Sequence, residues 1–111
     1  MAVMFVDAGA LRSELALEIS EPEPDGLGGY SESWVEVATL FGRIEPVNAE
    51  TVFGADQTLE SVTHRVTLRW RGDVKSGMRL SKLGRRFDIL TVHDPDESGR
   101  YLVCRVREVG L

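Results

Sequence analysis

The fold is decided by residues 80–109, LSKLGRRFDILTVHDPDESGRYLVCRVREV. Phe87, Ile89 and residues 90–92 form an apolar, β-branched run, and residues 94–99 are dense in turn-forming side chains. A second run follows from Tyr101, in which Tyr101, Val103, Arg105 and Arg107 fall on one side of the strand and Leu102, Cys104, Val106 and Glu108 on the other. Two strand-like runs joined by a turn of Pro, Asp and Gly predict an antiparallel β-hairpin.

The N-terminal half carries two further strand patterns. Apolar and polar residues alternate strictly from Arg12 to Ile19, and we expect Pro22 and Pro24 to end this strand because proline cannot donate to a sheet ladder. A second strand is predicted from Ser33 to Val47, closed by Pro46. Its alternation slips at residues 38–40, where a bulge or bend would restore the register.

The central part of the chain predicts one long strand and one short one. Alternation from Glu60 to Arg71 places a row of apolar residues towards the core and a basic, hydroxyl-bearing row on the solvent side. A turn at residues 72–77 leads to a short strand at residues 78–83. The count of about six strands predicts an all-β fold, a small antiparallel barrel or sandwich, as a single domain over residues 1–111. The expected core row is Val62, His64, Val66, Leu68 and Trp70.

Composition is that of a soluble globular protein, with 42% hydrophobic and 28% charged residues. No apolar run approaches the ~20 residues that span a bilayer, so we expect no membrane contact. The first six residues lack the basic flank and the length of a signal peptide. The chain is therefore expected to work in the cytoplasm or in something assembled there.

Charge is distributed unevenly along the chain. The formal net charge is −5, with most acids in the N-terminal half and most basic residues in the C-terminal half. This distribution predicts one acidic and one basic face, and the acidic total favours protein contacts over direct binding of nucleic acid. The basic residues that we select as ring or partner contacts are Arg65, Arg69, Arg71, Arg85 and Arg86.

A long polar excursion separates the second and third predicted strands. Asn48–Thr58 exceeds the ~2–5 residues of an ordinary hairpin loop, and long loops in compact domains are often functional. Val52 and Phe53 are its apolar residues. They either pack back onto the core or become ordered only against a partner.

No group of residues supports catalysis or metal binding. His64 shares the core side of its strand, His93 lies beside Asp94, and Cys104 is expected to be a buried structural thiol, so these residues do not form a recognisable nucleophile or zinc motif. Residues 94–99 imitate the first half of a calcium-binding loop, but Arg105 stands where that motif requires a bidentate Glu. We therefore predict a turn, no cofactor and a protein that is not an enzyme.

The order of short motifs along nearly the whole chain resembles the head-closure proteins of tailed phages, also called stopper or head–tail joining proteins. The matching pieces are Leu11-Arg12, Gly28-Gly29, Trp34, Val37-Ala38-Thr39, Arg43-Ile44-Glu45-Pro46, Thr63-His64-Arg65-Val66, Leu68-Arg69, Gly77-Met78-Arg79-Leu80, Arg86-Phe87-Asp88-Ile89-Leu90 and Asp94-Pro95-Asp96-Glu97.

This resemblance implies a small β-barrel that assembles as a six-membered ring between the portal and adaptor above and a tail protein below. It implies a neck component of a phage or of a phage-like gene-transfer particle, assembled in the bacterial cytoplasm, which retains DNA without reading its sequence. It also places the long loop at the channel. Asn48 begins that loop, Glu50 and Asp56 would face the DNA, and Val52 and Phe53 would close the gate.

Two other functions compete with this interpretation. A nucleic-acid-binding barrel would use Arg65, Arg69, Arg71 and an exposed Trp70 for base stacking, whereas the alternation places Trp70 in the core. A small hydrolase or metal-dependent enzyme would need a catalytic motif that the sequence lacks.

Overall fold

The structure, a computed structural model, describes residues 8–47 and 62–110. A short 3-10 turn precedes six strands, and every strand pair is antiparallel. The all-β prediction is therefore confirmed. The elements are η1 (Ala8–Ala10), β1 (Ser13–Pro24), β2 (Tyr30–Pro46), β3 (His64–Arg69), β4 (Arg79–Lys82), β5 (Arg85–His93) and β6 (Tyr101–Val109).

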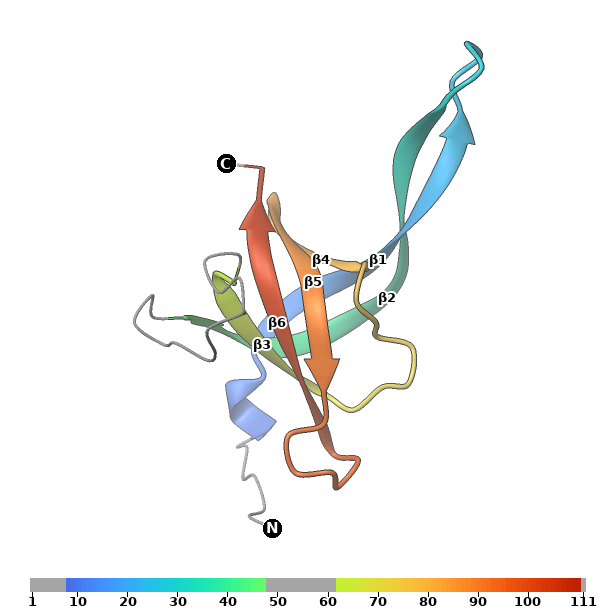
Figure 1. Cartoon of the computed structure of the whole chain (residues 1–111). Coiled ribbons are helices and arrows are strands. Elements are labelled where there is room, and N and C mark those ends of the chain that lie inside the picture. The colour runs from blue at the N-terminus through green and yellow to red at the C-terminus, as the bar shows by residue number, and fades with distance from the viewer. Residues whose placement is uncertain (1–7, 48–61, 111) are drawn as a thin grey trace, which may run out of the picture.

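The six strands close into a barrel with the order β1-β2-β3-β6-β5-β4, in which β4 pairs back onto β1 (Figure 1). The predicted C-terminal hairpin is confirmed, because β5 and β6 pair from Arg86 with Val109 to His93 with Val103. Closure leaves every strand of the barrel wall with two neighbours, which satisfies the backbone hydrogen bonds on both sides.

The barrel interior is filled by alternate side chains of all six strands, as a period of two requires. Phe87, Leu15 and Leu17 are fully buried, and Cys104 lies among them with no exposed surface. The core cluster consists of Leu15, Leu17, Leu40, Val66, Leu68, Val74, Met78, Leu80, Phe87, Ile89, Leu102, Cys104 and Val106.

The third strand is shorter than its alternation predicted, and Trp70 is not in the core. Val66 and Leu68 are buried as expected, but β3 ends at Arg69 and Trp70 is 49% exposed. Beyond the last paired residue the backbone no longer alternates, so parity stops specifying a face. The solvent row is also interrupted, because Thr67 is only 2% exposed and pairs with the buried Val103.

Strands β1 and β2 continue beyond the barrel wall as a two-stranded ribbon (Figure 1). Strand β1 meets β4 only at residues 16–18, and β2 meets β3 only at residues 42–46. We call the remaining ribbon and its turn, residues 19–35, the arm. In the part of the chain that the structure describes, the strands of the arm pair only with each other.

The first strand is longer than the predicted Arg12–Ile19: β1 runs through Pro22 and ends at Pro24. Pro22 and Pro24 lie two residues apart, so their missing N–H groups point to the same side of the strand. Because β1 has β2 as its one neighbour there, proline at an edge is tolerated. A bulge was predicted near residues 38–40, and the structure places it next to them, at Val37. Leu17 pairs with Ala38 and Glu18 with Glu36, which leaves Val37 as the extra residue.

Candidate interaction surfaces

The long segment between β2 and β3 leaves and re-enters one end of the barrel. Pro46 pairs with His64, and the Val47 amide donates to the Thr63 carbonyl at 2.9 Å, so the two ends of this segment are joined. The residues predicted to form the channel loop and gate lie outside the described residues. They are Asn48, Glu50, Val52, Phe53 and Asp56.

A polar network secures this end of the barrel. The Thr63 hydroxyl lies 2.8 Å from His64 Nδ1 and accepts the Glu108 amide at 2.7 Å. Arg85 donates two hydrogen bonds to the Glu108 carboxylate, at 2.8 and 3.1 Å. The Arg85 guanidinium lies 4.9 Å from the centre of the Phe87 ring. Thr63 and Arg85 therefore hold the point where the loop is attached.

His64 is structural, as the sequence predicted. Its ring meets Phe87 edge-on, with centroids 5.3 Å apart at 79°. Desolvation lowers the pKa of His64, and the positive charge of Arg85 lowers it further. The carboxylate of Glu108 raises it, but the net shift is downward. The pKa of Glu108 is in turn lowered, chiefly by its hydrogen bonds from Arg85. A neutral imidazole held between an aromatic ring and a hydroxyl has a packing role.

The five arginines predicted as contacts do not form a single patch. Arg85 and Arg86 begin β5, while Arg69 and Arg71 lie at and just beyond the far end of β3, where Arg69 pairs with Tyr101. Arg71 is held by Asp73 through two hydrogen bonds of 2.9 Å. In the described part of the chain, Arg69 and Arg86 have no ion-pair partner.

Arg65 instead belongs to a basic surface that the sequence reasoning did not assemble. Arg65 and Arg105 are register partners on β3 and β6, and Arg107 follows two residues along β6. Their neighbours Val66, Cys104 and Val106 point into the core, so these three arginines stand on the outer side. The signal in the sequence was the regular spacing of residues 105 and 107, but its alignment with β3 requires the strand order.

Arg43 adds a fourth cation to this outer side from β2. Glu45 is shared between Arg43 at 3.1 Å and Arg65 at 3.2 Å, and it is the only carboxylate paired with either in the described residues. Arg107 lies 3.7 Å from Asp88, and both side chains remain partly exposed. We call Arg43, Arg65, Arg105 and Arg107 the arginine face.

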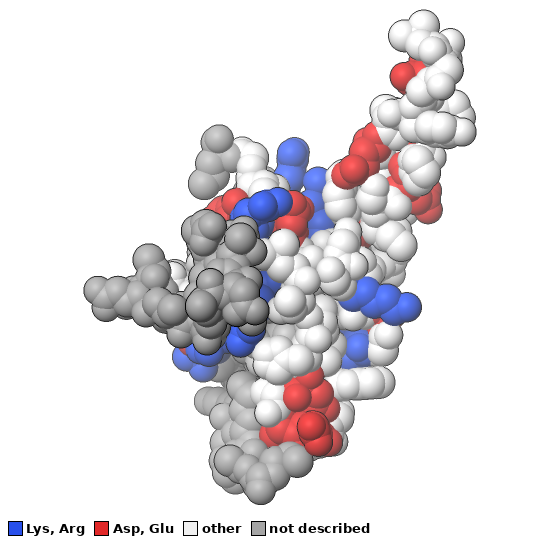
Figure 2. Space-filling model, viewed as in Figure 1, with Lys and Arg blue, Asp and Glu red and all other residues white. Residues whose placement is uncertain are grey.

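The opposite kind of charge gathers on β1 and β2. Every charged side chain between Ser13 and Gly42 is acidic, and Figure 2 shows acidic and uncharged side chains along the arm with no basic one among them. Glu18 alone of this set has an ion pair, with Arg79 at 2.7 Å, within the described residues. The acidic part of the predicted charge separation therefore lies on one hairpin, whereas the basic residues are spread over several strands. The acids are Glu14, Glu18, Glu21, Glu23, Asp25, Glu32 and Glu36.

The root of the arm is fixed to the barrel by Arg79. Glu18 and Glu36 are direct cross-strand partners, an arrangement that is unfavourable for like charges. Arg79 relieves it by pairing with Glu18, and its guanidinium lies 4.1 Å from the centre of the Trp34 ring. Arg79 of β4 therefore fixes the base of the arm against the barrel wall.

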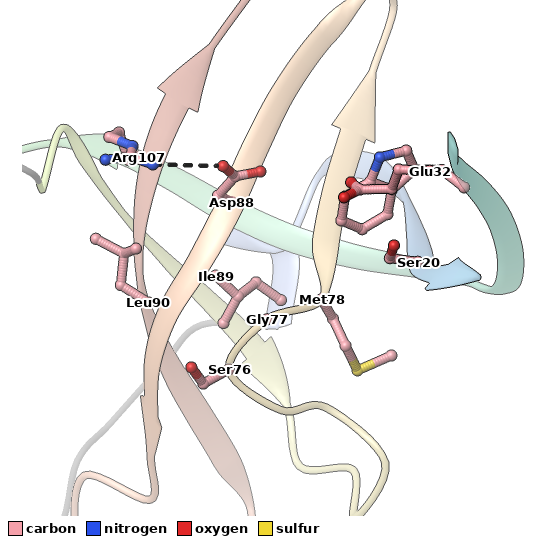
Figure 3. Close-up of a pocket in the computed structure, with 10 residues that line it drawn as sticks. Ser20, Glu32, Ser76, Gly77, Met78, Asp88, Ile89, Leu90 and Arg107 are labelled. Atoms are coloured by element: carbon pink, nitrogen blue, oxygen red, sulfur yellow. Dashed lines mark ion pairs between the residues drawn. The ribbon is translucent and has the colours of Figure 1, made fainter. Parts of the chain in front are cut away.

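Beside this root lies an open pocket of about 380 Å³ (Figure 3). Ser20 and Glu32 border it from the arm, and Asp88 and Arg107 border it from the barrel, joined by their ion pair. No histidine or cysteine lines the pocket, so it holds neither a Ser–His nor a Cys–His pair. The lining residues are Ser20, Glu32, Trp34, Ser76, Gly77, Met78, Asp88, Ile89, Leu90 and Arg107.

The acidic turn between β5 and β6 uses its carboxylates internally, which confirms the predicted turn. Asp94 accepts the amides of Asp96 and Gly99, and the buried Asp96 accepts both the amide and the hydroxyl of Ser98. Arg100 lies 3.3 Å from Asp96. These carboxylate oxygens close the turn.

Cys104 is a buried structural thiol, as predicted. Desolvation raises its pKa to about 12, so the thiol stays protonated and is a poor nucleophile. Across the described residues, no group of three or more potential ligands could hold a metal ion.

The sequence matches the model of a family described as phage head completion protein over residues 6–109. No curated protein matches the chain. The family is one of structural virion proteins, which confirms the prediction that the chain is not an enzyme.

Two solved structures share the fold. A chain in the virion of a native gene transfer agent particle is 24% identical, with a TM-score of 0.66, and the match covers 89% of this chain and 96% of that one. The solution structure of a Shigella flexneri 2a protein, SF1141, is 23% identical, with a TM-score of 0.70, and the match covers 93% and 96%.

Proposed function

Because this chain belongs to the phage head completion protein family and has a structural role in closing the head, we propose that it forms a ring in the neck of the particle. The ring lies between the portal and adaptor complex and the tail, retains packaged DNA and presents the docking surface for the tail. The whole chain acts as one domain. The observation that carries this proposal is the family match, which spans nearly the entire chain.

The architecture supports a structural role. A closed barrel pairs its strand edges and gives a rigid wall, and ion pairs such as Arg79 with Glu18 and Arg85 with Glu108 join its strands. No helix in the described residues is long and apolar enough to cross a membrane. We infer that the partners are other proteins of the particle and the DNA that passes through the neck.

A ring of identical copies requires that each copy offers two different, complementary surfaces. The acidic β1–β2 hairpin and the arginine face supply opposite charges at different places on one molecule. A hexamer is the number of copies that we propose, as the resemblance to head-closure proteins implies.

The channel loop is proposed to be residues 48–58. Support comes from its attachment, since the network of Thr63, His64 and Arg85 holds the barrel end from which it departs. Glu50 and Asp56 would repel the DNA backbone and let it slide, while Val52 and Phe53 would pack around the ring axis.

We expect Phe53→Ser to lower DNA retention, because it removes the largest apolar group from the proposed gate. The measurement is the fraction of DNA-filled heads among particles made with the variant. Phe41→Ser is the matched control, since Phe41 is 53% exposed on β2 and outside the loop. Equal retention by the Phe53 variant and the wild type would contradict a gating role.

One observation favours a second candidate, a nucleic-acid-binding barrel. Trp70 is exposed between Arg69 and Arg71, an arrangement suited to stacking on a base. The net charge of −5 opposes this function, because phosphate binding requires an excess of basic residues. Salt-dependent affinity of the purified chain for single-stranded DNA, lost in Trp70→Ala, would favour it.

The test of head closure is electron microscopy of particles from a host that lacks the gene. We expect heads that have lost their DNA beside separate tails. Intact, tailed and DNA-filled particles would exclude the stopper function and would make nucleic-acid binding the leading candidate.

A further inference from the structure

The arm is a two-stranded sheet without a covering partner. Its apolar side chains remain open, with Tyr30 74% exposed, Ile19 40% and Val35 39%. An isolated two-stranded ribbon is marginally stable in water. The described residues of the same chain therefore leave the outer half of the arm largely exposed, which favours its coverage by another molecule.

The two faces of the arm carry different chemistry. Directly paired residues of antiparallel strands lie on the same face. One face carries the pairs Glu21 with Ser33 and Glu23 with Ser31 and, nearer the root, Ile19 with Val35. The other face carries Pro22 with Glu32 and Pro24 with Tyr30, so it has one acid where the first has two. We call the first the acidic face of the arm. Because Pro22 and Pro24 block strand addition along β1, the acidic face is better suited to binding than that edge is.

The arginine face matches the acidic face in both sign and spacing. Glu21 and Glu23 are two residues apart on one strand, and so are Arg105 and Arg107 on β6. Residues two apart on one side of a strand are separated by about 7 Å. A strand of the arm laid along β6 therefore brings carboxylates and guanidinium groups into register.

No ion pair joins these two surfaces within the described residues, although Glu32 of the arm and Arg107 border one pocket. Within the described residues, neither Glu21 nor Glu23 has an ion pair, and the cations paired with Glu45 and Asp88 keep about half of their side-chain surface exposed. The carboxylates of Glu21 and Glu23 and the guanidinium groups of Arg43, Arg65 and Arg107 are thus accessible to a neighbour.

We propose that the acidic face of the arm of one copy lies on the arginine face of the next copy, and that this contact links the ring. The proposal rests on the ring assembly of the proposed function and identifies its interface. A contact between two different surfaces is heterologous, and its repetition closes a ring when the rotation per copy is right. DNA on the arginine face, or a different particle protein on the arm, would be the competing occupants.

The test is a charge exchange in the purified full-length chain, followed by sedimentation velocity at low ionic strength over a range of protein concentrations. One variant carries Glu21→Lys with Glu23→Lys, and a second carries Arg105→Glu with Arg107→Glu. We expect the wild type to self-associate and each variant to associate at least about tenfold more weakly, because like charges then face each other.

An equimolar mixture of the two variants is expected to restore association. In an alternating ring, each Lys-bearing arm meets a Glu-bearing face and each native arm meets a native face. A third variant carries the single change Glu23→Lys, and Glu97→Lys is its matched control, since Glu97 is an exposed acid outside the arm. Thermal melting of each variant establishes that the barrel remains folded.

A wild type that stays monomeric, variants that associate like the wild type, or a mixture that fails to recover would each overturn the proposal. This readout is independent of head closure. Restored association together with intact particles from the gene-deleted host would exclude head closure and keep the arm contact. Failed restoration together with DNA-free heads would exclude the arm contact alone.

Discussion

Phe87 joins the core of the barrel to the network that anchors the long loop. Its ring is fully buried, meets His64 edge-on and lies under the guanidinium of Arg85. Phe87 therefore serves both the core and the network, and its removal would take away the aromatic contact of both His64 and Arg85.

We expect Phe87→Ala to lower the free energy of unfolding by about 3–5 kcal/mol, the usual cost of removing a buried aromatic ring and leaving a cavity. Urea denaturation of the purified chain measures it. Leu27→Ala is the control, since Leu27 is 90% exposed and its loss should change stability by less than about 0.5 kcal/mol. A loss below about 1 kcal/mol for the Phe87 variant would show that the cluster is not structural.

His64 gives stability a pH dependence whose sign follows from burial. Desolvation lowers its pKa in the folded chain, so the unfolded state binds a proton first as the pH falls. The contribution of His64 to the free energy of unfolding is therefore constant above the ordinary histidine pKa of about 6.5. It declines as the pH falls below that pKa, until the pKa of His64 in the folded chain is reached. The pKa of His93 is lowered as well, by desolvation and Arg105, and adds to the same decline.

We expect the wild type to lose stability between pH 7 and the folded pKa of His64, and a His64→Gln variant to lose less. Urea midpoints at a series of pH values measure the difference, and His93→Gln separates the contribution of the second histidine. Identical slopes for the wild type and the His64 variant would contradict the proton linkage.

At the scale of the element, β2 is the strand that passes from the barrel wall into the arm. Gly42 lies where it enters the wall, paired with Ser13 on one side and Leu68 on the other. An added Cβ there would lie 2.7 Å from the Leu68 side chain, 3.0 Å from the Thr67 carbonyl oxygen and 3.1 Å from Leu15. The close approach of three strands requires glycine at this position.

Gly42→Ala is expected to lower the free energy of unfolding by about 1–3 kcal/mol, because the Thr67 backbone cannot move aside without disturbing the sheet. Gly72→Ala is the matched control, since its Cβ would meet only the Trp70 ring, at 3.5 Å or more. Denaturation midpoints of the two variants decide the matter, and equal midpoints would show that the wall accommodates the methyl group.

At the scale of the whole molecule, the barrel and the arm differ in what holds them. The barrel has a continuous buried core, whereas the arm beyond Ser20 and Trp34 buries no large apolar side chain. The barrel should therefore fold without the arm. The root contacts of Arg79 with Glu18 and Trp34 lie on the barrel side of that boundary.

Replacing residues 21–33 by Asn-Gly, which suits a two-residue hairpin turn between Ser20 and Trp34, is expected to change the free energy of unfolding by less than about 1 kcal/mol. Circular dichroism and urea denaturation measure it. A loss above about 3 kcal/mol would show that the arm belongs to the folding unit.

The sequence determined the local features of this protein, including strands, turns, the bulge beside Ala38, the buried Cys104 and the family. Alternation at a period of two reports which side of a strand is apolar, and Pro, Gly and Asp report where strands turn. Only the tertiary structure decided which edges are paired. It left Trp70 exposed beyond the end of β3, carried β1 through Pro22, separated Arg85 from Arg69 and brought Arg65 beside Arg105. These outcomes depend on barrel closure, a long-range property that local alternation does not encode.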